Sequence, residues 1–255
     1  MLIATISLGI YEKFLFKDRP VLDKKKSLKL LGIGGIVALH WFFFYHSIKT
    51  STISVALICL SSTALFSSFL SPIFNKSHKF SLIDLITGLV IIVGIIFIFH
   101  FESGYTEGII YGLICSFMAA LFTILNEIEV KDLPASTIGY FEMLGGFICM
   151  SAYLLLTSFS TDYQLAISLS DSIYLIILGT VCTALAYVFG VAVMKEISAY
   201  TVVLTTNLEP VYGILLAFLI FGKDELMTPG FYQGAIIILA AVFIYPFVKK
   251  RFNTK

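Results

Sequence analysis

Long apolar stretches recur along the chain at nearly constant spacing, and no other feature of the sequence constrains the fold as strongly. About 20 apolar residues in a helix, at roughly 1.5 Å rise per residue, cross the hydrocarbon core of a bilayer. Short interruptions with Lys, Asp, Asn, Pro or Gly separate the stretches. We therefore expect eight full membrane-spanning helices, at about residues 28–48, 52–74, 82–101, 106–126, 135–158, 172–194, 198–221 and 229–248.

A further apolar segment runs from Met1 to about Phe16 but meets Glu12 and Lys13 after eleven residues. It is too short to cross a bilayer unless these two charged side chains snorkel, so we interpret it as the second half of a span. A signal peptide is the alternative, but no Lys or Arg precedes the stretch and no A-x-A-like cleavage site follows it. The predicted fold class is an all-α membrane protein with about nine transmembrane helices, eight full and one partial.

Composition and motifs limit the classes of function that this chain can have. The residues are 58% hydrophobic and 13% charged, with net charge +1, so neither a water-soluble fold nor a nucleic acid partner is expected. The four cysteines form no CxxC pair or Cys/His cluster, and HExxH, Walker A, GxSxG and GxGxxG motifs are absent. We expect no metal, no cofactor, no catalytic residues and no enzyme activity. The expected partners are a small-molecule solute and membrane lipid, and a homo-oligomer is left open.

The basic residues predict the orientation, because Lys and Arg accumulate in cytoplasmic loops. With the spans above, 15 of the 17 basic residues fall on one face, and only Lys49 and Lys223 fall on the other. The C-terminus is therefore expected in the cytoplasm, and the expected location is a multi-pass position in a bacterial inner membrane. The cytoplasmic set is Lys13, Lys17, Arg19, Lys24, Lys25, Lys26, Lys29, Lys76, Lys79, Lys131, Lys195, Lys249, Lys250, Arg251 and Lys255.

A weak internal repeat appears when each residue is compared with the residue 147 positions later. The three spans from 28 to 101 then correspond to spans five helices further on. Because five is odd, the two halves must have opposite orientations in the membrane, an arrangement found in secondary transporters. Among the matched pairs are Leu31-Gly32 with Leu178-Gly179, Phe42 with Phe189, Ser51 with Ser198, Val55 with Val202 and Leu57 with Leu204.

The region from Ser198 to Tyr212 contains the run Leu208-Glu209-Pro210-Val211 and is followed by Phe221-Gly222-Lys223-Asp224-Glu225 and by Gly234. These residues resemble the EamA-type drug/metabolite transporters. The resemblance implies a five-plus-five inverted repeat of ten helices. This chain would then lack the first helix, with an incomplete N-terminal repeat at 1–103 and a C-terminal repeat at 104–255. The first repeat departs from the pattern, because Ser62 and Thr63 stand where the second has Glu209 and Pro210.

Two aromatic groups with polar tips are the first candidates for a solute pathway. His40 lies mid-span, and the repeat pairs it with Tyr187. Polar side chains within spans are costly and normally face a bundle interior or a wet cavity. Each could bind solute, and His40 could also relay a proton; the alternative is a structural hydrogen bond to a neighbouring helix. Trp41 is a candidate wall for apolar or cationic solutes, with lipid contact as its alternative.

Glu209 is the other mid-span candidate. Pro210 cannot donate its helical hydrogen bond, so we expect a kink there and a free carbonyl beside a carboxylate that could hold a cation or proton. Asn207 and Thr205 lie on the same stretch and could add hydrogen bonds, although Thr more often bonds its own backbone. We expect His40, Tyr187 and Glu209 to surround one central cavity.

Other residues have structural interpretations. Glu142, about two turns inside its span, is expected to snorkel towards the cytoplasm. The pairs Gly108 with Gly112 and Gly230 with Gly234 have a spacing that lets helices approach closely, so we interpret them as packing positions.

The leading hypothesis is a secondary transporter that exports a small metabolite or drug-like solute by alternating access. A membrane enzyme of unrecognised type, or a non-transporting membrane subunit or fragment, are the alternatives. Solute flux in proteoliposomes separates the first from the others.

Overall fold

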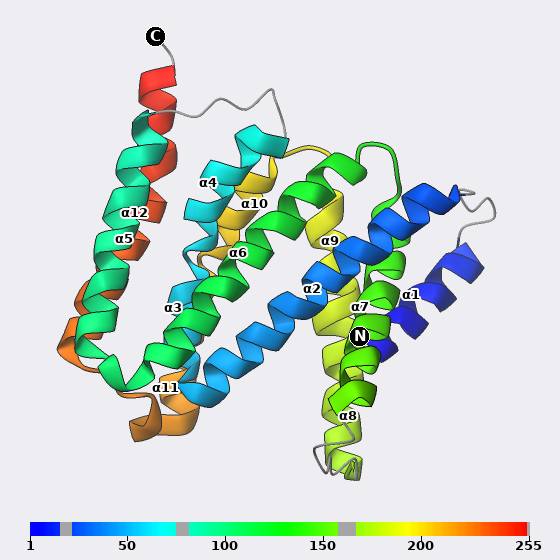
Figure 1. The fold of residues 1–255 in the computed structure, drawn as a ribbon, viewed down its shortest axis with the longest axis horizontal. Helices are drawn as coiled ribbons and strands as arrows, with labels where there is room; N and C mark the ends of the chain where they lie inside the picture. Colours follow the sequence, from blue (N-terminus) through cyan, green and yellow to red (C-terminus); the bar gives the residue numbers. More distant parts are fainter. Residues whose placement is uncertain (16–21, 75–81, 158–166, 254–255) are drawn as a thin grey trace. The chain divides into compact units, whose positions relative to one another are not determined.

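In a computed structural model of the 255-residue chain, residues 1–15, 22–74, 82–157 and 167–253 are described, and every regular element within them is helical (Figure 1). The all-α class predicted from the sequence is confirmed. The α-helices are α1 (Leu2–Leu15), α2 (Lys24–Thr50), α3 (Ile53–Leu60), α4 (Thr63–Phe74), α5 (Leu82–Phe101), α6 (Thr106–Glu129), α7 (Ala135–Thr157), α8 (Leu169–Ile177), α9 (Ala186–Val193), α10 (Ala199–Thr206), α11 (Glu209–Phe221) and α12 (Pro229–Asn253).

Six helical stretches among the described residues are long and apolar enough to cross a membrane, and a shorter apolar helix covers Ile86–Phe101. The chain is therefore an integral, multi-pass membrane protein, while the count of nine spans stays a prediction. Of the basic residues used for the orientation, Lys17, Arg19, Lys76, Lys79 and Lys255 lie outside the described residues. The six stretches are Lys24–Thr50, Ile53–Phe74, Ser103–Glu129, Ala135–Thr157, Leu169–Val193 and Pro229–Lys249.

The chain forms two compact units, and each takes segments from both halves of the sequence. Unit 1 comprises Met1–Ala38 and Leu125–Ser198, and unit 2 comprises Leu39–Ile124 and Ala199–Lys255. The chain passes from one unit to the other inside α2, inside α6 and again between α9 and α10. The predicted repeat boundary near residue 103 therefore does not coincide with a boundary between units, and the two repeats stay a prediction.

In unit 1, α7 packs on α1 and approaches the backbone of α2 closely. A Cβ added to Gly34 of α2 would overlap the backbone of Glu142, and one added to Gly145 of α7 would overlap the backbone of Leu31. Only glycine leaves room for two helices to pack backbone to backbone at these points. These contacts fix Glu142 against α2 on one side of its helix.

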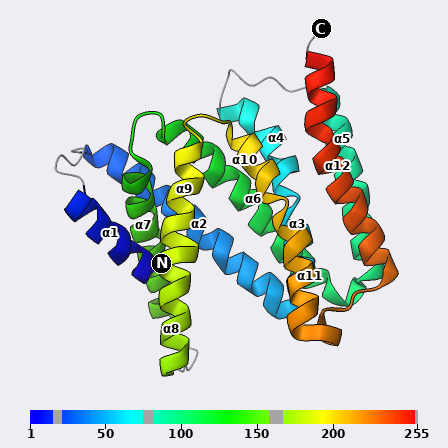
Figure 2. The same ribbon diagram turned by 180° about the vertical axis from the view of Figure 1, so that it is seen from behind.

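In unit 2, α5 and α12 lie side by side in both ribbon views (Figures 1 and 2). Gly230, at the start of α12, meets the ring of Phe101 at the end of α5, whereas Gly234 meets Gly94. A Cβ added to Gly234 would lie 2.7 Å from the Gly94 carbonyl oxygen. The two helices are therefore antiparallel, and they are the spans that the internal repeat pairs.

Unit 2 also contains two of the spans expected from the sequence, and each is broken into two helices. The first is α3 and α4, separated at Ser61–Ser62, and the second is α10 and α11, separated at Asn207–Leu208. The repeat offset of 147 carries Ser61 onto Leu208, so the breaks coincide to within a residue. Helix α3 packs on α11 and α4 on α10, so the first half of each span meets the second half of the other.

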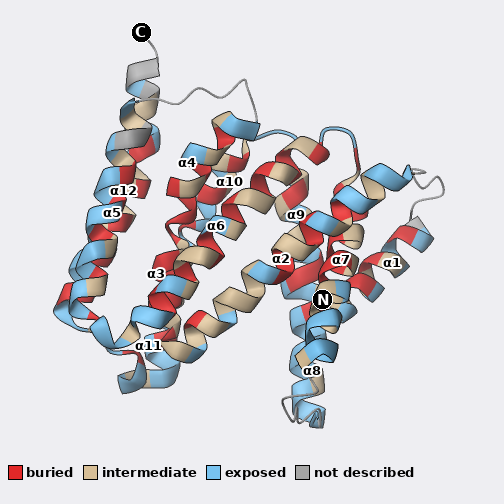
Figure 3. Ribbon diagram, in the orientation of Figure 1, coloured by how far each residue is buried: buried red, intermediate tan, exposed pale blue. Residues whose placement is uncertain are grey.

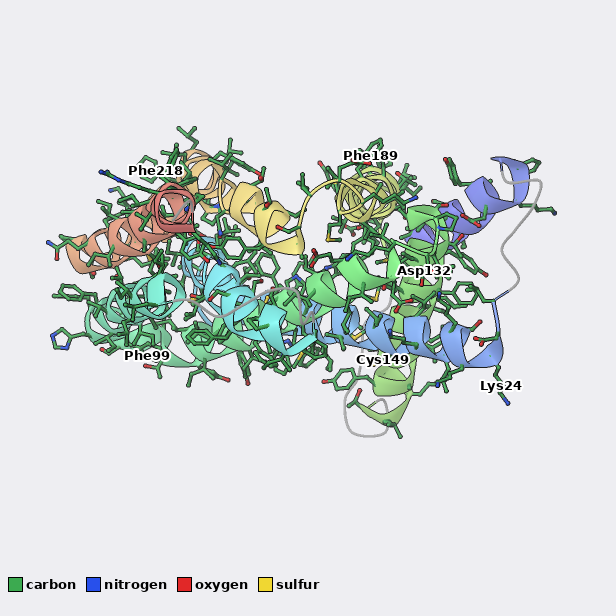
Figure 4. All side chains as sticks on the ribbon, turned by 90° about the horizontal axis from the view of Figure 1, so that it is seen from above. Lys24, Phe99, Asp132, Cys149, Phe189 and Phe218 are labelled. Atoms are coloured by element: carbon green, nitrogen blue, oxygen red, sulfur yellow. The ribbon has the colours of Figure 1, made fainter. Side chains whose placement is uncertain are left out.

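Apolar side chains cover much of the outside of the described helices. Figure 3 shows buried residues concentrated along α3 and α4, whereas α8 and the outer sides of α5 and α12 are largely exposed. Among the exposed side chains are Phe189 and Phe218, labelled in Figure 4. Extensive exposed apolar surface is unstable in water and is what lipid contact requires.

Candidate functional site

The paired helix breaks of unit 2 form the first candidate site. A helix end leaves backbone N–H or C=O groups without helical partners, and in a bilayer such groups are tolerated only where protein or water satisfies them. At the first break, the Ser61 and Ser62 N–H groups bond carbonyl oxygens three residues back, at 3.2 and 3.0 Å. At the second, the Leu208 N–H bonds the Thr205 carbonyl at 3.1 Å. Both breaks are thus tight turns; Ser61, Ser62 and Asn207 are buried in them, whereas Leu208 is exposed.

Buried polar groups accumulate at these breaks. The hydroxyl oxygens of Ser61 and Ser62 and the amide nitrogen of Asn207 are buried, and none has a hydrogen-bond partner among the described residues. Leaving a buried polar group unsatisfied costs about 1–3 kcal/mol, so three of them in matching turns indicate a place for a polar ligand or water. Of these three residues, the sequence had indicated only Asn207.

The other sequence candidates near the second break have defined local surroundings. Glu209 begins α11 and is half-buried, so its carboxylate lies at the positive end of that helix dipole. Pro210 occupies the first turn of α11, where its missing N–H removes no helical bond. Thr205 is exposed and its hydroxyl donates to the Thr201 carbonyl at 3.0 Å. Thr205 thus uses its hydroxyl on its own helix.

His40 also belongs to unit 2, on α2. Its Nδ1 lies 3.0 Å from the Cys115 carbonyl of α6, and its ring packs edge-on against Phe122 at 5.4 Å between centroids. A carbonyl oxygen only accepts, so Nδ1 carries the hydrogen in this bond. The neighbouring Trp41 is half-buried. Tyr187 belongs to unit 1, so the expected cavity shared by His40, Tyr187 and Glu209 stays a prediction.

The four glycines interpreted from the sequence as packing positions all lie at close helix contacts within unit 2. A Cβ on Gly108 would overlap Ser51, and one on Gly112 would lie 2.7 Å from the Cβ of Cys59. Gly230 and Gly234 meet α5 as described above. These four positions leave no space for a side chain.

Unit 1 contains the second candidate site, built around Glu142 of α7. Its side chain is completely buried, and Oε2 accepts hydrogen bonds from the Tyr187 hydroxyl at 2.5 Å and from the Asn126 amide at 3.2 Å. The same Asn126 nitrogen lies 2.9 Å from the Tyr187 oxygen. The expectation that Glu142 snorkels to the cytoplasm is wrong, because two donors from α6 and α9 hold its carboxyl group inside the unit.

A π-helical segment, Leu178–Leu185, immediately precedes Tyr187 and separates α8 from α9. π-Helical turns contain an extra residue and occur frequently at functional sites. The extra residue rotates the face of the helix that follows, so the 3.6-residue periodicity of the sequence does not carry across to Tyr187. Tyr187 was nevertheless a sequence candidate, because the repeat pairs it with His40. Asn126 was missed, because it stands near the end of an apolar span and carries no charge.

Comparisons with known proteins agree with this description. Residues 106–245 match the EamA-like transporter family. The chain is similar to an uncharacterized transporter of Archaeoglobus fulgidus, with 24% identity over 79% of this chain and 69% of that protein. It is also similar to the uncharacterized transporter YdfC of Bacillus subtilis, with 23% identity over 98% of this chain and 81% of that protein.

A solved structure titled "Crystal structure of protein" has a similar fold, with a TM-score of 0.69 at 12% identity over 98% of this chain and 85% of that one. The apolar helices and the family match together define a membrane transporter. The chain belongs to the EamA-like transporter family, as the resemblance of its sequence predicted.

Proposed function

We propose that this protein is a secondary transporter that exports a small metabolite or drug-like solute across the cytoplasmic membrane by alternating access. The observation that carries the proposal is the pair of broken spans in unit 2, interrupted at matching positions of the repeat and packed first half against second half. Discontinuous helices related by an inverted repeat form the solute sites of many secondary transporters.

The unpartnered groups at the breaks support a solute site at this position. Ser61 and Ser62 can donate or accept, and the Asn207 amide nitrogen can donate, so together they suit a solute with oxygen or nitrogen acceptors. Glu209 adds a carboxylate at the start of α11, which favours a cationic or protonated solute group. The proposed solute is therefore small, with both apolar and polar parts.

Flux in proteoliposomes tests the proposal. Purified protein is reconstituted and its efflux of ethidium, an aromatic cation, is measured beside that of a panel of labelled amino acids and nucleosides. We expect flux of at least one solute above that of empty liposomes. Asn207→Leu should lower this flux at least tenfold, because it replaces the buried amide with an apolar group.

Leu219→Ala on α11 is the matched control, because Leu219 is exposed and lies on the same helix as the proposed site. Its flux should equal that of the unsubstituted protein. No flux of any tested solute, at a protein level that gives folded monodisperse material, would contradict the proposed transport.

The proposed direction and orientation have separate tests. The basic tail from Lys249 onward is proposed to lie in the cytoplasm. A reporter fused after Lys255 that fluoresces only in the cytoplasm should be bright in bacterial cells. Export predicts that cells expressing the protein accumulate less of a transported solute than cells without it.

A further inference from the structure

Two unpartnered oxygen atoms face the same hydrogen-bonded cluster in unit 1. Both donors that reach Glu142 bond its Oε2, whereas its Oε1 is buried without a partner. The Oδ1 atom of Asn126 is also buried without a partner, although its Nδ2 bonds Oε2 of Glu142. Each of the two oxygens is an acceptor that lacks a hydrogen.

One proton shared between Oε1 and Oδ1 would give both atoms a partner. A carboxylic acid and a primary amide form a cyclic pair, in which the amide N–H donates to one carboxyl oxygen and the carboxyl O–H donates to the amide oxygen. The bond from Asn126 to Oε2 is already one half of this pair. A proton on Oε1 would supply the other half, and the Tyr187 hydroxyl would continue to donate to Oε2.

We propose that Glu142 is the group that binds and releases a proton during transport, with Asn126 and Tyr187 as positioning residues. The inference rests on the proposed transport function. In the step, an O–H bond forms at Oε1 with a proton from water and breaks when the proton returns to water. The structure corresponds to the proton-bound, closed form, since Glu142 has no exposed surface.

Release requires water to reach Glu142, so the deprotonated carboxylate favours an arrangement of unit 1 in which the cluster is open. A buried carboxylate with an unsatisfied oxygen is costly, and that cost biases the protein towards the open arrangement. Proton binding and conformation are thereby coupled, as proton-driven solute movement requires.

Other titratable groups of unit 1 surround this cluster. Glu129 of α6 is ion-paired with Lys29 of α2. Glu12 of α1 is buried against α7, where it accepts a hydrogen bond from Thr137 at 3.2 Å. Among these acids, Glu142 is the one whose amide neighbour carries a complementary unpartnered oxygen. The titratable groups on the elements packed around α7 include Glu12, Lys29, Glu127, Glu129 and Tyr187, together with Tyr11 and Lys13 of α1 and Lys24, Lys25 and Lys26 of α2.

Infrared difference spectroscopy tests the proton site without any solute. The reconstituted protein is titrated with pH while the C=O stretch of protonated carboxyl groups is recorded. We expect a carboxyl band that disappears as the pH rises and that is absent from Glu142→Gln. Glutamine preserves the cluster, because its amide group donates to Asn126 Oδ1 while its oxygen accepts from Tyr187.

Glu225→Gln in unit 2 is the matched control. Glu225 is also buried, but both of its carboxylate oxygens already accept hydrogen bonds, so it needs no added proton. The band assigned to Glu142 should therefore remain in this variant. Asn126→Leu should shift the frequency of the band, since it removes one half of the cyclic pair. An unchanged pH-dependent band in Glu142→Gln would overturn the assignment.

Ethidium efflux separates failure of this inference from failure of the proposed function. A proton gradient should stimulate efflux severalfold in the unsubstituted protein, and Glu142→Gln should lose the stimulation while retaining exchange of solute across the membrane. Ethidium efflux at the same rate with and without a proton gradient would overturn the proton-binding role of Glu142 and leave the transport proposal intact. Loss of the stimulation in Glu209→Gln but not in Glu142→Gln would also overturn it. Flux of no solute contradicts the transport proposal, and the infrared band then still decides whether Glu142 binds the proton.

Discussion

Two buried glutamates, Glu225 in unit 2 and Glu142 in unit 1, have opposite hydrogen-bond environments. Glu225 accepts from the Ile53 N–H at 3.0 Å, the Ser54 N–H at 3.0 Å and the Ser54 hydroxyl at 2.7 Å, so both oxygens are bonded at the start of α3. Both hydrogen bonds to Glu142 reach its Oε2, and its Oε1 is buried without a partner. A fully bonded carboxylate stabilises a helix end, whereas an incompletely bonded one keeps a cost that a proton can remove.

The largest effect is expected for Glu225→Ala. It leaves two backbone N–H groups and one hydroxyl at the start of α3 without their acceptor, which should lower the free energy of unfolding by about 2–4 kcal/mol. Unfolding of the detergent-solubilised protein by denaturant, followed by circular dichroism, measures this loss. Stability equal to that of the unsubstituted protein would show that Glu225 does not hold α3.

Glutamine substitutions at Glu142 and Glu225 should differ in their effect on stability. Glu142→Gln keeps every hydrogen bond of the proton-bound cluster, so its stability should stay within about 1 kcal/mol of the unsubstituted protein. Glu142→Ala creates a cavity and orphans two donors, with an expected loss of about 2–3 kcal/mol. Glu225→Gln should lose more stability than Glu142→Gln, because an amide nitrogen cannot accept. The reverse order in the same unfolding assay would refute the contrast.

Removing one donor from Glu142 should alter pH dependence. Tyr187→Phe takes away a hydroxyl that donates to Oε2, and that bond is stronger when the carboxyl group is charged. Without it, the proton is held to higher pH. The midpoint of flux against pH should therefore move upward by about one unit, which corresponds to about 1.4 kcal/mol. A midpoint that stays in place would mean that Tyr187 does not position the proton site.

The smallest effect is expected for Ser54→Ala, the equivalent removal of one donor from Glu225. The two backbone donors remain, so stability should fall by about 1 kcal/mol. The pH profile of flux should be unchanged. A shifted profile would show that Glu225, too, takes part in proton binding and would remove the distinction between the two sites.

The sequence predicted the helical spans closely. The expected spans 82–101 and 52–74 compare with α5 at Leu82–Phe101 and with the pair α3 and α4 from Ile53 to Phe74. Span ends are encoded locally, because a bilayer sets the helix length and polar residues end it. The repeat also pairs the spans that correspond to α5 and α12, and these two helices pack together in the structure.

The interior of the spans was harder to predict. Pro210 made a distortion near residue 209 foreseeable, but the break at Ser61–Ser62 has neither proline nor glycine. We attribute it to packing, since α3 and α4 lie against the two parts of the other broken span. The environment of Glu142 likewise depends on Asn126 and Tyr187, which come from other helices. Such contacts between distant residues leave no periodic signal in one sequence.

The broken spans also set an order for assembly of the protein in the membrane. Helix α3 has 8 residues and α10 also has 8, and at about 1.5 Å per residue neither crosses a bilayer alone. The partners of α3 and α4 are synthesised roughly 140 residues later, a delay of about 7–28 s at a ribosome speed of roughly 5–20 residues per second. During that interval the turn at Ser61–Ser62 has no α10 or α11 to cover it. The first broken span can therefore reach its final packing only after the C-terminal half has been synthesised.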